Sequence, residues 1–171
     1  NLYKIDDELF KAIMDNLTSA EKALQTFGDM ASIVTGEHDS EKISLSFLYD
    51  QICNIIKEID HVLTLKKHRI LLSDKKNIFD NLYVEINTGY FNKVIEEILF
   101  NSMKFSPARS EIMVLFRKQG DVCIISVIND VTANDKGHVG IPLGYENLVF
   151  EPFFRLTKTV NDRYETLDYG L

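Results

Sequence analysis

Three polar side chains in one helical segment have the types and the spacing of a phosphate-handling site. Residues 89–105 are expected to form a helix, in which Glu97, Asn101 and Lys104 project together about one turn apart. An amide oxygen such as that of Asn101 can ligate Mg²⁺, which shares its oxygen ligands with phosphates. Lys104 can neutralise a phosphate, and Glu97 can deprotonate or orient an attacking group. Lys93 falls on the same side of the helix.

The same spacing also fits a solvated helix face. A ladder of Glu97, Asn101 and Lys104 would then contribute only a few tenths of a kcal/mol to helix stability. The sequence contains no metal-spaced cluster of Cys and His and no glycine-rich Walker loop. The rest of the helix is expected to pack on a sheet through one apolar face, formed by Val94, Ile95, Ile98, Leu99, Ser102, Met103 and Phe105.

The segments around this helix predict an α+β fold. Apolar residues recur in steps of three and four from Leu2 to Val34, which predicts one long amphipathic helix that needs a partner helix. A second helical pattern follows with Ser46 as its N-cap. Together these patterns predict helices on one face of a mixed sheet: a strand over 42–45, a helix over 47–63, strands over 69–72 and 82–86, and a hairpin of 112–116 and 122–128.

The composition and charge of the chain limit the classes of protein to which it can belong. The chain has 171 residues, 45% of them hydrophobic, with a net charge of −7 and a pI near 5.1. It lacks the basic excess of a nucleic-acid-binding protein, so no nucleic-acid partner is expected. No apolar run is long enough to cross a membrane. Cys53 and Cys123 lie in apolar runs and are expected to be buried free thiols.

Four motifs, in order, resemble those of sensor histidine kinases. Residues 94–106, VIEEILFNSMKFS, resemble the N box of the catalytic and ATP-binding domain of that family, and residues 148–155, LVFEPFFR, resemble its F box. Gly140-Ile141-Pro142 resembles the end of the first glycine box. Asp168-Tyr169-Gly170-Leu171 resembles the opening of the second, so residues 40–171 are expected to be an ATP-binding domain truncated at its C-terminus. Residues 1–36 then correspond to the second helix of the dimerisation and phosphoacceptor hairpin.

The resemblance implies a two-layer Bergerat-type sandwich that binds ATP and Mg²⁺. Carried over to this sequence, it makes Asn101 the metal ligand and Lys104 a phosphate contact. Glu97, the candidate catalytic residue, stands where many histidine kinases have Asn, although glutamate occurs there elsewhere in the superfamily. Asn129 stands where the family has an Asp that accepts from the adenine amino group, and an amide oxygen can also accept that hydrogen bond. The implied nucleotide-binding set is Asn101, Lys104, Asn129, Asp130, Gly140, Phe150 and Gly170.

The sequence also departs from the family pattern elsewhere. Val131 replaces a glycine of the first glycine box, and residues 132–139 resemble an insertion. No histidine has the context of a phosphoacceptor, so the acceptor lies upstream, in another chain, or nowhere. The four histidines are interpreted as surface, packing or lid residues: His38, His61, His68 and His138. The aromatic residues of the F box are expected to pack on the core.

The implied activity is transfer of the ATP γ-phosphate to a histidine, followed by relay to the receiver domain of a response regulator. The protein is expected to form a homodimer through its first helix and to place this domain in the cytoplasm, whether or not the parent protein is membrane-anchored. The fragment alone is expected to be inactive, since it lacks the acceptor. Two alternatives stay open: a degenerate signalling module that does not turn over ATP, and another ATPase of the same superfamily, which Glu97 would suit.

Overall fold

The chain divides into two compact units, one that contains helix α1 and one that begins at Asp39. The computed structural model describes residues 6–35, 39–74, 81–133, 137, 139–151, 154 and 156. The predicted functions of the two parts, 1–36 and 40–171, stay predictions.

The first unit is built on α1 (Asp7–Thr35), a single helix of 29 residues. The predicted helix over 2–34 is therefore present from Asp7, and residues 1–5 lie outside the described part. Asp7 and Glu8 occupy its first turn, where negative charge complements the helix dipole. Seven large apolar side chains among the described ones of α1 are exposed: Leu9, Phe10, Ile13, Met14, Leu17, Leu24 and Phe27. Within the described residues, no helix combines the length and hydropathy needed to cross a membrane.

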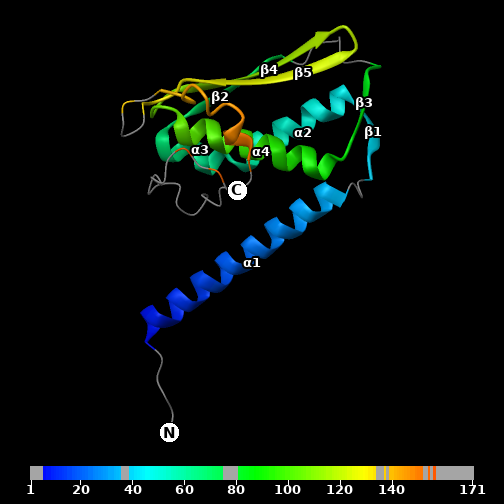
Figure 1. Cartoon of the computed structure of the whole chain (residues 1–171). Coiled ribbons are helices and arrows are strands. Elements are labelled where there is room, and N and C mark those ends of the chain that lie inside the picture. The colour runs from blue at the N-terminus through cyan, green and yellow to red at the C-terminus, as the bar shows by residue number, and fades with distance from the viewer. Residues whose placement is uncertain are drawn as a thin grey trace. The chain divides into compact units, whose positions relative to one another are not determined.

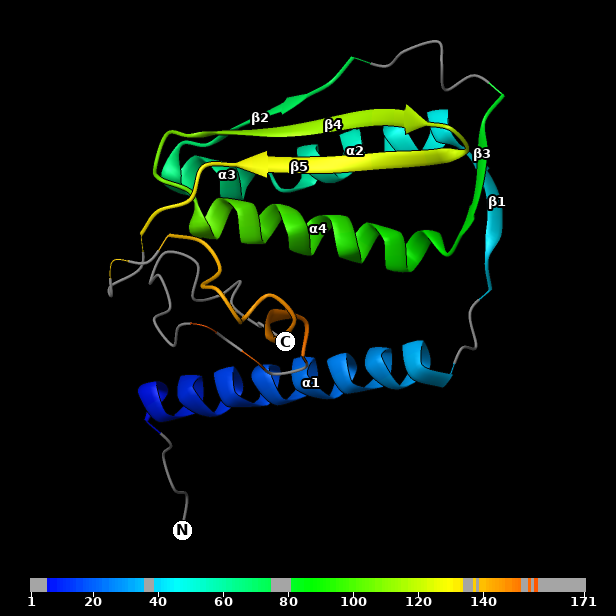
Figure 2. The same ribbon diagram turned by 45° about the horizontal axis from the view of Figure 1, so that its top comes forward.

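The second unit is a layer of helices on a layer of strands, which confirms the predicted α+β class (Figures 1 and 2). Strand β2 (Arg69–Leu72) runs parallel to β4 (Glu111–Gln119), and β4 pairs antiparallel with β5 (Val122–Asn129). Strand β1 (Glu41–Ser44) pairs antiparallel with β3 (Tyr83–Ile86) at one end of the unit (Figure 2).

The predicted hairpin is confirmed and is longer than expected. The pairing of β4 with β5 runs from Gln119 opposite Val122 to Ile112 opposite Asn129. Gly120 sits in the connecting turn with φ of +59°, a left-handed conformation that glycine adopts without steric cost. The register places Ile125, Val127 and Asn129 opposite the buried residues of β4, Phe116, Val114 and Ile112.

Helices α2 (Leu45–Glu58), α3 (Asp60–Lys66) and α4 (Thr88–Phe105) cover one face of the β2-β4-β5 sheet (Figures 1 and 2). The single helix predicted over 47–63 is wrong: it is divided at Ile59, whose φ of −88° and ψ of 4° interrupt it. Ile59 is itself buried, and the break allows both helices to pack on the sheet. The predicted N-cap Ser46 is also wrong, because Ser44 Oγ accepts the hydrogen bond from Phe47 N at 3.1 Å.

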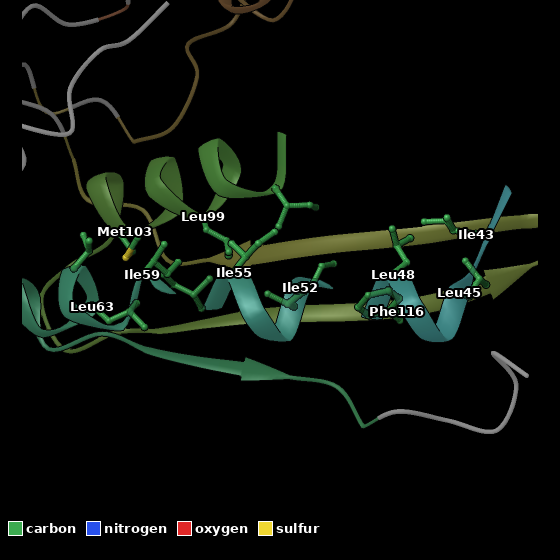
Figure 3. Packing of buried hydrophobic residues seen from close by; sticks show 14 residues of the cluster. Ile43, Leu45, Leu48, Ile52, Ile55, Ile59, Leu63, Leu99, Met103 and Phe116 are labelled. Atoms are coloured by element: carbon green, nitrogen blue, oxygen red, sulfur yellow. The ribbon is translucent and has the colours of Figure 1, made fainter. Parts of the chain in front are cut away.

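The core lies between the helices and β4. Figure 3 shows side chains from α2, α3 and α4 meeting those of the strands, and the labelled residues include Ile52, Leu99, Met103 and Phe116. Ile52, Leu99 and Met103 are fully buried. Cys53 and Cys123 are free thiols as predicted, but they are half-buried rather than buried.

Candidate nucleotide site

Helix α4 presents a polar face beside its buried stripe. The buried positions Ile95, Leu99 and Met103 recur in steps of four, so they lie on the side that packs on the sheet. Glu97 and Asn101 are exposed, and Lys104 is half-buried. The three residues predicted to act together therefore lie one turn apart on the outside of α4.

The predicted packing face of α4 is too wide. Val94, Ile98 and Phe105 were expected to be buried against the sheet, but 54%, 40% and 45% of their surfaces are exposed. A helix packs through a stripe, and Ile95, Leu99, Ser102 and Met103 already fill it. The three exposed side chains consequently form an apolar row that flanks Asn101.

The surroundings of Glu97 raise the pKa of its carboxyl group. Desolvation by surrounding atoms raises the pKa of Glu97 above its ordinary value, and the negative charge of Glu96 raises it further. The positive charge of Lys104 acts on the pKa in the opposite direction. A carboxyl that holds its proton closer to neutral pH is suited to act as a base.

The side-chain amide of Asn101 is the second polar group of this face that could meet a ligand. The side-chain amide of Asn101 has no hydrogen-bond partner among the described residues, so its oxygen is open to a ligand. Over the same part of the chain, no group of three or more His, Cys, Asp or Glu is positioned to hold a metal. A Mg²⁺ ion needs no such cage, because it commonly takes one or two protein oxygens and completes its shell with phosphates and water. The residues present fit that mode of binding.

The C-terminal end of α4 is tied to α3 and β2. Lys66 Nζ donates to the carbonyls of Met103 at 3.3 Å, Lys104 at 2.8 Å and Ser106 at 3.4 Å. The ring of His68 also bonds the Met103 carbonyl, at 3.1 Å. These contacts satisfy carbonyls that a helix end leaves unpaired, and the charge of Lys66 complements the negative end of the helix dipole. Sequence reasoning missed Lys66, because nothing in its spacing marks it. His68 was interpreted only as a surface or packing residue, and it is buried.

A second set of bonds ties the same helix end to the residues after β5. Thr132 donates to the Phe105 carbonyl through its backbone N and through Oγ1, each at 2.9 Å. Asn129 Nδ2 donates to Ser106 Oγ at 3.1 Å. The register of β5 places Asn129 opposite Ile112, on the helix-covered face of the sheet. Asn129 is thereby held at the end of the helix that carries Asn101 and Lys104.

The remaining predicted contacts lie in the segment after β5. Asp130 is exposed, and its backbone carbonyl accepts a hydrogen bond from Ser106 Oγ at 3.0 Å. Gly140 has a φ of +72°, a conformation that disfavours a side chain there.

Phe150 ends the short 3-10 helix η2 (Leu148–Phe150) and is 85% exposed, so the prediction that it packs on the core is wrong. Among the other F-box aromatics, Phe154 contacts Tyr145 with ring centroids 6.0 Å apart. Gly170 and Phe153 lie outside the described residues.

Comparison of the structure with solved proteins identifies the fold. The catalytic domain of histidine kinase ThkA in a nucleotide-free form aligns with a TM-score of 0.54 and 14% identity, over 69% of this chain and 72% of that one. A second nucleotide-free form of ThkA gives 0.56 and 16%, over 71% and 73%. Acinetobacter baumannii histidine kinase AdeS gives 0.56 and 11%, over 75% of this chain and 62% of its own.

The second unit has the fold of a histidine-kinase catalytic domain. The predicted Bergerat-type sandwich is thereby confirmed. No protein-family model matches the chain, and no curated protein matches it. At identities between 11% and 16%, the likeness is one of fold, and the histidine-kinase fold by itself assigns no role to Glu97, Asn101 or Asn129.

Proposed function

We propose that the chain is the ATP-binding catalytic part of a histidine kinase and that it transfers the γ-phosphate of ATP to a histidine outside residues 1–171. The observation that carries this proposal is the outer face of α4, where Glu97, Asn101 and Lys104 lie one turn apart inside a histidine-kinase fold. The phosphoryl group then passes to the receiver domain of a response regulator. The protein works in the cytoplasm, as a homodimer through α1.

Each residue has a distinct task in the proposed reaction. Lys104 neutralises charge on the phosphates, and Asn101 supplies one oxygen ligand to the metal. Mg²⁺, when bound, supplies further neutralisation of the phosphate oxygens. Glu97 orients the attacking group and accepts its proton, a task that its raised pKa favours. Asn129, held at the end of α4, accepts a hydrogen bond from the adenine amino group. Asp130, Gly140, Phe150 and Gly170 complete the proposed nucleotide-binding set.

A titration of Mg·ATP into the protein at its full natural length tests the site. Asn101→Ala is the diagnostic variant, and Asn54→Ala is the matched control, because Asn54 is an exposed asparagine of α2. We expect wild type and Asn54→Ala to bind with a Kd below about 1 mM, roughly −4 kcal/mol, and Asn101→Ala to lose binding. Absence of binding by the wild-type protein contradicts the proposal and favours a signalling module that does not turn over ATP.

A second candidate is an ATPase of the same superfamily. The raised pKa of Glu97 supports it, because a carboxylate of that kind can also activate water. Incubation with ATP labelled in its γ-phosphate separates the two reactions. An acid-labile, base-stable label on the protein indicates a phosphohistidine, whereas release of labelled inorganic phosphate with no labelled protein indicates hydrolysis.

A further inference from the structure

The side-chain amide of Asn129 is held by two hydrogen bonds from its nitrogen. Nδ2 donates to Ser106 Oγ at 3.1 Å and to the backbone carbonyl of Asp130 at 2.8 Å. Ser106 is 1% exposed and caps the C-terminal end of α4. Its hydroxyl lies 2.6 Å from the Ser102 carbonyl and 3.0 Å from the Asp130 carbonyl.

These partners permit only one orientation of the amide. A carbonyl oxygen accepts and cannot donate, so the Asp130 carbonyl requires the nitrogen of Asn129. The hydroxyl of Ser106 has a single hydrogen, and both carbonyls beside it compete for that hydrogen. Ser106 Oγ therefore offers Asn129 lone pairs alone. A rotated amide would place Oδ1 against two oxygens, and burial of Ser106 prevents water from compensating.

The free polar atom of Asn129 is consequently its oxygen. Oδ1 has no hydrogen-bond partner among the described residues, and Asn129 is half-buried at the C-terminal end of α4. An oxygen fixed in this way accepts hydrogen bonds but cannot donate them. The exocyclic amino group of adenine is a donor, whereas guanine carries a carbonyl oxygen at the same ring position.

We propose that Ser106 is a positioning residue that locks the Asn129 amide, so that the site binds adenine nucleotides and rejects guanine nucleotides. This inference rests on the proposed function. An asparagine without the lock can turn its amide through half a rotation and offer an N–H group to guanine. A carboxylate at this position has no donor, so its selectivity needs no lock. Selectivity should therefore depend on Ser106 only while residue 129 is an asparagine.

Calorimetric titration of Mg·ATP and Mg·GTP into the full-length protein tests the lock. The variants are Ser106→Ala, Asn129→Asp and the double variant that combines them. Ser102→Ala is the matched control, because Ser102 is also buried in α4 and its hydroxyl bonds the Ile98 carbonyl instead. We expect Ser106→Ala to reduce the preference for ATP about fivefold, the factor that one hydrogen bond is typically worth. Ser102→Ala should keep the wild-type preference, and the double variant should have the same preference as Asn129→Asp, because a carboxylate at position 129 needs no lock.

Two binding results overturn the lock and leave the proposed function intact. One is a preference of Ser106→Ala for ATP over GTP that equals the preference of the wild-type protein. The other is equal weakening of both nucleotides, which would make Ser106 a purely structural residue. A wild-type protein that binds neither nucleotide overturns the proposed function and the selectivity together.

The lock can also be measured without a nucleotide. Both hydrogens on Asn129 Nδ2 are bonded, whereas the amide of Asn101 is exposed and has no partner among the described residues. We expect the side-chain amide hydrogens of Asn129 to exchange with water more slowly than those of Asn101 in NMR spectra of the wild-type protein. Equal exchange rates overturn the lock whether or not Ser106→Ala folds.

Discussion

Glu97 is the residue whose electrostatics bear most directly on the proposed chemistry. Desolvation and the charge of Glu96 raise its pKa, and Lys104 lowers it. A base with a raised pKa is protonated at mildly acidic pH and becomes active as the pH rises. The rate of phosphoryl transfer should therefore have an acidic limb that lies above the pH at which an ordinary Glu titrates.

Replacement of Glu97 by Gln should remove that acidic limb and slow phosphoryl transfer by about a hundredfold or more, with little change in the Kd for ATP. Glu96→Gln is the control, because loss of the Glu96 charge lowers the pKa of Glu97 and should move the limb to lower pH without a comparable loss of rate. Rates measured between pH 4 and pH 9 check both expectations. An unchanged limb in Glu97→Gln contradicts the role of Glu97 as the base.

His68 makes the stability of the second unit depend on pH. Its Nε2 must donate to the Met103 carbonyl, so Nδ1 of the neutral ring accepts from Ser110 Oγ at 3.1 Å. Burial lowers the pKa of His68, and the positive charge of Lys66 lowers it further, against the raising effects of its backbone contacts to Met103 and Ser110. The unfolded chain therefore binds a proton at a higher pH than the folded chain does.

As the pH falls below about 6.5, the unfolded state gains protons at His68 that the folded state does not bind, and the free energy of unfolding decreases. His68→Gln cannot titrate and should lose less stability between pH 7.5 and pH 5 than the wild-type protein. Urea unfolding at the two pH values measures the difference. The exposed His61, replaced by Gln, should keep the wild-type pH dependence, and an equal pH dependence in His68→Gln would rule out this contribution.

At the scale of elements, the end of α4 is the junction that organises the candidate site. Its last carbonyls are bonded by Lys66 and His68 from the side of α3 and β2, and by Thr132 from the segment after β5. The periodicity of the sequence predicted α4 to within one residue, at 89–105 against the observed Thr88–Phe105. It did not predict these partners, because they are at least 27 residues away in the chain.

The start of α2 offers a test of helix capping. Ser44 Oγ bonds Phe47 N, whereas Ser46 lies inside the helix. Ser44→Ala should reduce the free energy of unfolding by about 1 kcal/mol, the usual cost of a lost N-cap. Ser46→Ala should change it by less than about 0.5 kcal/mol, because alanine has the higher helix propensity. Urea unfolding of the two variants decides between Ser44 and Ser46 as the cap.

At the scale of the whole molecule, the exposed apolar stripe of α1 remains to be covered. Leu17 and Leu24 are 51% and 71% exposed, seven residues apart on one side of the helix. Helices with such stripes are stabilised by packing against another helix. A second copy of α1 is the partner that the proposed function requires.

Leu17→Glu should shift the full-length protein from dimer to monomer, because it places a charge in the middle of the apolar stripe. Lys11→Glu introduces the same charge on another side of α1 and should leave the dimer intact. Light scattering measures the molar mass of each protein. A monomeric wild-type protein, or a dimer that survives Leu17→Glu, contradicts dimerisation through this stripe.

The sequence by itself determined the class of fold, the elements that build it and the residues that are candidates for chemistry. These features depend on local periodicity and short motifs, which chain neighbours specify. Glu97, Asn101 and Lys104 share a face because they share a helix. Only the tertiary structure decided which apolar residues of α4 are buried, that Phe150 is exposed, and that Ser106 and Asn129 meet. Those outcomes depend on contacts between distant segments, where available surface and hydrogen-bond partners are set by packing rather than by spacing.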